Sequence, residues 1–214
     1  MEQIREKLFE LQDKKYQEFH SKLCPNVEDI IGVRIPDLRK LAKQIAKENP
    51  QEFLEKAPKE YYEERILQGF VIGYMKAELE EKLAYLDKFV PIVDNWAVCD
   101  CCTSTYKFTN QYLEEMWEYI QKYLSSSREF ELRFAIIMLM NYYLTEEYID
   151  QVLAIYDSIQ NEGYYVKMGI AWAISMAYVK FPDKTMQLLQ KNHLDDFTYN
   201  KALQKMIESY QIDK

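Results

Sequence analysis

Apolar residues recur every three or four positions along almost the whole chain, which is the spacing of one face of an α-helix. The 214 residues include only 5 Gly and 6 Pro. A sheet of many short strands needs more turn residues than these, whereas a handful of long helices needs few. The sequence therefore predicts an all-helical protein.

The apolar pattern and its interruptions predict where the helices lie. Ile4, Leu8, Leu11 and Phe19 mark a first helix that ends at Cys24-Pro25-Asn26. Pro36 fits the first turn of a second helix, and Asn49-Pro50 ends that helix and starts a short third one. The helices predicted after these span residues 60–76, 78–92, 95–108, 110–124, 129–144, 146–159, 164–181, 183–192 and 196–211.

The loops between these helices are short, so neighbouring helices are expected to run antiparallel. Amphipathic helices alternate with helices that are apolar nearly all round, as in a stack whose inner helices touch neighbours on two sides. No linker or low-complexity stretch divides the chain. We therefore predict one domain over residues 1–214, an α-solenoid of antiparallel HEAT-like helix pairs with a concave face.

The net charge and the cysteines indicate which partners and which cellular environment the sequence favours. The net charge is −8, whereas nucleic-acid binders usually have a basic balance, so the composition favours a protein partner. No apolar run is long enough to cross a membrane, and the charged start does not read as a signal peptide. Three of the four Cys are crowded at 99, 101 and 102, which favours a reducing cytoplasm over a disulfide framework. With only two His and no paired ligand spacing, no metal is expected.

One set of residues can carry chemistry. Trp96 and Asp100 are four apart, so on a helix they share a face. Arg133 opens a helix that is apolar nearly all round, and Trp172 lies in another. The steps from 96 to 133 and from 133 to 172 are 37 and 39 residues, close to the roughly 40 residues of a helix pair in such repeats. The four residues are thus predicted to form a stripe on equivalent faces of successive repeats.

This stripe has two interpretations. Two aromatic faces and a carboxylate suit cleavage of an N-glycosidic bond, because the sugar becomes positively charged in the transition state. The guanidinium of Arg133 would then hold a backbone phosphate. Alternatively, Trp96 and Trp172 are core aromatics, and Asp100 and Arg133 form a structural ion pair between inner helices.

Four segments resemble the AlkD-like DNA alkylation repair family. Residues 32–43 are similar to its GV-x-x-P-x-LR segment, and Trp96 with Asp100 to its W-x-x-x-D motif. Residues 132–135 resemble its R-x-A segment, and residues 169–173 its A-I-G-W-A helix. The similarity runs in order from about residue 25 to the C-terminus. Ser175 stands where the family typically has a basic residue.

The resemblance implies a HEAT-like solenoid that grips duplex DNA and excises 3-methyladenine and 7-methylguanine without the base-flipping pocket of other glycosylases. It implies that Asp100 stabilises the sugar cation, that Trp96 and Trp172 lie against the deoxyribose, and that Arg133 binds phosphate. No cofactor is expected. Lys167 and Lys201 either contact DNA near the stripe or are solvated surface charges.

Three functions remain open at this level. The first is a glycosylase acting on double-stranded DNA with alkylated bases. The second is a non-catalytic protein that binds unusual DNA structures, and the third is a scaffold for a protein partner.

Overall fold

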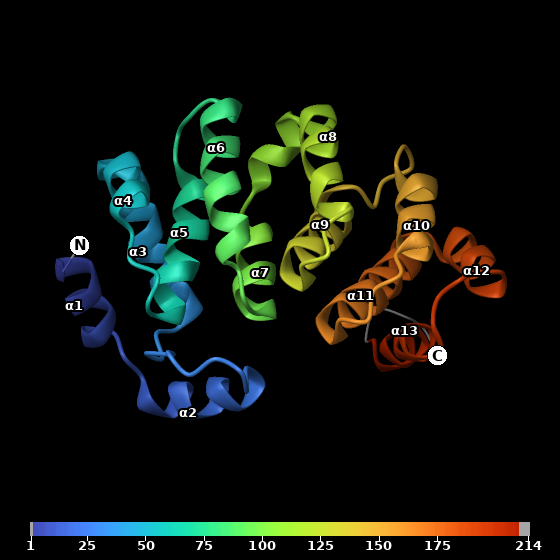
Figure 1. The fold of residues 1–214 in the computed structure, drawn as a ribbon, viewed down its shortest axis with the longest axis horizontal. Helices are drawn as coiled ribbons and strands as arrows, with labels where there is room; N and C mark the ends of the chain where they lie inside the picture. The colour runs from blue at the N-terminus through green and yellow to red at the C-terminus, as the bar shows by residue number, and fades with distance from the viewer. Residues whose placement is uncertain (1, 210–214) are drawn as a thin grey trace. The chain divides into compact units, whose positions relative to one another are not determined.

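The computed structural model describes residues 2–209, and this part of the chain is all-helical, with no β-strand. The helices form two compact units that divide between Tyr112 and Leu113. Figure 1 shows the order of the helices along the chain. None of the described helices is long and apolar enough to span a membrane.

The first unit is built around α5. Its helices are α1 (Glu2–Glu10), α2 (Lys14–Leu23), α3 (Ile35–Glu48), α4 (Pro50–Lys56), α5 (Tyr62–Tyr74), α6 (Leu79–Phe89) and α7 (Trp96–Thr103), with 3₁₀ turns η1 (Val90–Ile92) and η2 (Lys107–Gln111). Helix α5 is buried over Tyr62–Ile72, because α3 and α7 pack on either side of it (Figure 1).

The second unit repeats this arrangement with different helices. They are α8 (Leu113–Leu124), α9 (Glu129–Tyr142), α10 (Ile149–Ser158), α11 (Tyr164–Lys180), α12 (Pro182–Gln190) and α13 (Asp196–Glu208). Helix α11 packs against both α9 and α13. The predicted alternation is confirmed here, since α8 buries one face whereas α9 is buried continuously over Leu132–Met140.

The predicted first helix is wrong, because two helices replace it. The carboxylate of Asp13 accepts the Tyr16 N–H at 3.0 Å and so starts α2 as a new helix. Phe19, one of the apolar residues that marked the predicted helix, is 59% exposed. The breaks at Pro36 and at Asn49-Pro50 are confirmed, since α3 and α4 both carry Pro in their first turn.

The predicted helix 95–108 is too long, because α7 ends at Thr103. The hydroxyls of Thr103, Ser104 and Thr105 donate to the carbonyls of Asp100 and Cys101, at 2.8–3.1 Å. Side-chain donors of this kind compete with the backbone N–H groups that would extend a helix. The chain then turns into η2 instead of continuing α7.

Candidate functional site

Helix α7 places Trp96 and Asp100 one helical turn apart in the first unit. The helix begins where the Asn95 side chain accepts the Val98 N–H at 2.9 Å, an N-cap bond. Ala97 and Val98 are buried, whereas Trp96 and Asp100 are only partly covered. The predicted helix therefore carries both residues one turn apart, and neither side chain is fully buried.

The indole of Trp96 is tied to the end of α2. Its N–H donates to the backbone carbonyl of Leu23 at 3.2 Å. Helix α2 is in turn held to the core through His20, whose Nε2 lies 2.9 Å from the hydroxyl oxygen of Tyr62 on α5. A ring anchored by its N–H has few accessible orientations, so Trp96 presents a defined surface beside α7.

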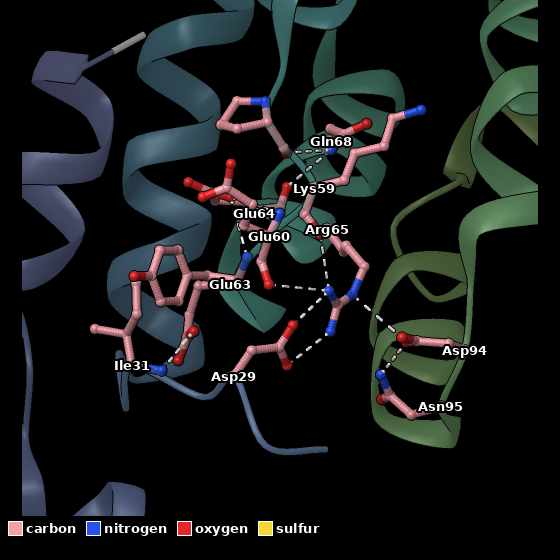
Figure 2. Close-up of polar contacts among 12 residues, drawn as sticks. Asp29, Ile31, Lys59, Glu60, Glu63, Glu64, Arg65, Gln68, Asp94 and Asn95 are labelled. Atoms are coloured by element: carbon pink, nitrogen blue, oxygen red, sulfur yellow. Dashed lines mark hydrogen bonds and ion pairs between the residues drawn. The ribbon is translucent and has the colours of Figure 1, made fainter. Parts of the chain in front are cut away.

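Arg65 fixes the start of α7 (Figure 2). Its guanidinium forms two hydrogen bonds with Asp29, at 2.7 and 3.0 Å, and a third with the carbonyl of Lys59 at 2.9 Å. Its Nε lies 3.4 Å from Asp94, whose carboxylate accepts a hydrogen bond from Asn95, the N-cap of α7. The Arg65 side chain is only 7% exposed, whereas its partners Asp29 and Asp94 are 32% and 55% exposed, so the guanidinium is buried and its acid partners are partly solvated.

Arg39 holds the other end of α7. Its Nη1 donates to the hydroxyls of Tyr74 and Thr105, both at 2.8 Å, and its Nη2 lies 3.5 Å from the Cys101 carbonyl. The guanidinium also lies 4.3 Å from the centre of the Phe70 ring. A planar, five-donor group is required to make all these contacts at once. These contacts explain Arg39, one of the two arginines in the segment 32–43.

Glu63 shapes the loop that precedes α3. Its carboxylate accepts the N–H groups of Ile31, Gly32 and Val33, at 2.9, 2.7 and 3.1 Å. Burial raises the pKa of Glu63, and these three hydrogen bonds oppose the rise. Gly32 has a φ of +99°, so a side chain there would be strained.

Arg65 and Glu63 were not predicted as part of the site, although the sequence contains a signal for them. Glu63, Glu64 and Arg65 open a helix that is otherwise apolar, and charged side chains in a buried helix need partners. The backbone partners of Glu63 and the carboxylate of Asp29 that pairs with Arg65 lie 30–36 residues away along the chain. Arg5, which pairs with Glu64, lies 59 residues away, so no local spacing identifies these partners.

In the second unit, Arg133 and Trp172 lie on α9 and α11. Arg133 is 4% exposed, and its Nη1 donates to the Tyr165 carbonyl at 2.5 Å. A Cβ on Gly169 would come within 3.2 Å of this nitrogen, so glycine leaves room for the guanidinium. Trp172 is partly covered. Ser175 is buried and donates to the Trp172 carbonyl at 2.7 Å, so this position points into the unit.

The two predicted DNA-contacting lysines have local partners. Lys167 is 15% exposed and pairs with Glu162 at 2.8 Å and with Asp195 at 3.6 Å. The Glu162 hydrogen bond raises the pKa of Lys167. Lys201 donates to Gln204 at 2.8 Å and lies 6.0 Å from the centre of the Phe197 ring. The DNA contacts of both lysines stay predictions.

In the cysteine cluster beside Asp100, Cys99 and Cys102 are buried and Cys101 is partly buried. Burial raises the pKa of Cys101 to about 11, and burial also raises that of Cys24 to about 11. The pKa of Cys102 rises well above its usual value for the same reason. Because a thiolate is the nucleophile, these raised pKa values leave the three thiols mostly protonated near neutral pH.

These observations define an all-helical protein that presents an indole and a carboxylate on one firmly held helix. Residues 4–206 match the sequence model of the family described as DNA alkylation repair enzyme. Because the match covers nearly the whole chain, the protein belongs to this family. Among curated proteins, no relative matches the chain. Membership supports a role in DNA repair, with DNA as the partner.

Proposed function

We propose that this protein is a DNA glycosylase that hydrolyses the N-glycosidic bond of cationic alkylated purines, such as 3-methyladenine and 7-methylguanine, in double-stranded DNA. The observation that carries this proposal is the pair Trp96 and Asp100, both partly exposed on a helix anchored at each end. No cofactor and no base-flipping pocket take part in the proposed reaction.

The chemistry follows from the charge that develops on the sugar. As the bond between C1′ and the base nitrogen breaks, the bonding electrons leave with the base, and the deoxyribose becomes an oxocarbenium ion. The Asp100 carboxylate and the π-face of Trp96 stabilise this cation. Water then bonds to C1′, and its proton passes to the carboxylate or to solvent.

An alkylated purine leaves without help from a strong general acid. It carries a positive charge before the bond breaks and departs as a neutral base. A site with one carboxylate and no second acid is therefore sufficient for this substrate class. An ordinary purine would need protonation, so the proposed site discriminates by the charge of the leaving group.

The proposal assigns further roles to the second unit. Trp172 lies against the deoxyribose and Arg133 binds a backbone phosphate, with Lys167 and Lys201 as additional DNA contacts. These roles rest on the order of the sequence motifs. The HEAT-like pairing of the helices, a single domain over residues 1–214 and a cytoplasmic location belong to the same proposal.

The test is release of 7-methylguanine from methylated duplex DNA by the wild type and by Asp100→Asn. We expect the substitution to abolish release while DNA affinity stays nearly intact. Asp183→Asn is the matched control, because Asp183 is an exposed carboxylate on α12 and the charge change is identical. Wild-type protein that binds DNA but releases no base would instead support a non-catalytic DNA-binding role.

A further inference from the structure

An open pocket of about 530 Å³ lies where the C-terminal ends of α3 and α5 meet. Three lysines line it, Lys43 and Lys47 from α3 and Lys76 from the connection that follows α5. All three side chains are exposed. The remaining lining residues are Ala46, Pro50, Gln51 and Tyr74.

The charged side chains that line this pocket are all positive. No carboxylate lines it. Within residues 2–209, none of the three lysines pairs with an acid, whereas Lys56 on the neighbouring α4 pairs with Glu52 at 2.9 Å. Gln51, which lines the pocket, donates a hydrogen bond to the carboxylate of Glu81 at 3.0 Å. Three ammonium groups together are unexpected in a chain of net charge −8.

The pocket is connected to the helix that carries Asp100. The Lys43 ammonium lies 5.2 Å from the centre of the Tyr74 ring, and the Tyr74 hydroxyl accepts a hydrogen bond from Arg39. Arg39 in turn reaches the Cys101 carbonyl, next to Asp100 in the chain. Pocket and candidate catalytic helix thus share one network of contacts inside the first unit.

We propose that this lysine pocket binds a backbone phosphate of duplex DNA. The inference rests on the proposed function, and adds to it a phosphate-binding site in the first unit. Lysine is a common phosphate ligand, and a flexible ammonium without an acid partner can neutralise a phosphate and release its counterions. An acidic protein can bind DNA in this way, through a local concentration of unpaired cations.

The experiment measures binding of the full chain to a short undamaged duplex at several salt concentrations. The variant combines Lys43→Gln, Lys47→Gln and Lys76→Gln, which are exposed positions where folding should survive; far-UV circular dichroism checks this. We expect affinity to fall on the order of tenfold, and the slope of log affinity against log salt to decrease by about 0.9 for each phosphate that the variant no longer neutralises.

Lys88→Gln is the control. Lys88 is exposed and its ammonium lies 5.4 Å from the centre of the Tyr85 ring, a geometry close to that of Lys43 and Tyr74. Unlike Lys43, it lines a pocket that contains a carboxylate, Glu55. We expect this variant to keep the wild-type affinity and salt slope.

Two outcomes would overturn the proposal. One is a triple variant with an unchanged slope, and the other is a loss of affinity in Lys88→Gln that is as large per removed charge as in the triple variant, which would show a general charge effect. The result is separable from the glycosylase test. Base release with an unchanged slope refutes only the pocket, whereas a reduced slope without base release refutes only the glycosylase.

Discussion

Replacing Arg65 with Met should destabilise the protein, because Arg65 joins the loop before α3 to the start of α7. Each charge-assisted hydrogen bond is worth roughly 1.5–3 kcal/mol, and Asp29 receives two of them. Asp29 is 32% and Asp94 is 55% exposed, so water replaces part of what these carboxylates lose. The substitution also removes the free-energy cost of burying the charged guanidinium, which offsets part of the loss. We therefore expect a net loss of about 2–3 kcal/mol in the free energy of unfolding.

The assay is urea unfolding followed by circular dichroism, with the slope compared between variants. Lys56→Met is the control, since both partners of the Lys56–Glu52 pair are more than half exposed and such pairs contribute about 0–1 kcal/mol. A loss below about 1 kcal/mol in Arg65→Met would refute the reasoning that the Arg65 network stabilises the fold. Base release should slow as well, because Trp96 and Asp100 depend on the position of α7.

Three further outcomes are expected. Trp96→Phe should retain more base release than Trp96→Ala, which should lose on the order of tenfold because a π-face beside the sugar cation is removed; equal losses would contradict the role of the ring. Arg39→Lys should lower the melting temperature although the charge is retained, because one ammonium cannot make the several hydrogen bonds by which the guanidinium joins Tyr74 to the end of α7. An unchanged melting temperature would contradict this. Because burial raises the pKa of Cys24 and that of Cys101 to about 11, the folded chain should hold these protons between about pH 9 and 11 while the unfolded chain loses them. Stability measured by urea unfolding should therefore fall as pH rises through this window, and a flat profile would contradict the burial of the thiols.

The helical pattern was predictable because it depends on local spacing. The limits of α9 and α11 follow from apolar periodicity and agree with the prediction within two residues. The break between α1 and α2 at Asp13 was not predicted, because the apolar spacing continues across it. An Asp followed by a helical run is nevertheless a signal for the start of a helix. Phe19 also misled the prediction, since an apolar side chain at helical spacing is not always buried.

The candidate site was predictable in part for the same reason. The four-residue step from Trp96 to Asp100 places both on one face of a helix, and this needs no long-range information. The residues that hold α7 could not be predicted, because Asp29, Arg65 and Asp94 meet only after the chain folds. Long-range ion pairs leave no periodic signal in a single sequence.

The measurement that tests the proposed role of Asp100 most directly is the single-turnover release of 7-methylguanine from methylated duplex DNA, with wild type and Asp100→Asn at matched, saturating concentrations. We expect release by the wild type, none by Asp100→Asn, and similar DNA affinity for both. Release by Asp100→Asn at the wild-type rate would contradict the assignment of Asp100 as the carboxylate that stabilises the sugar cation.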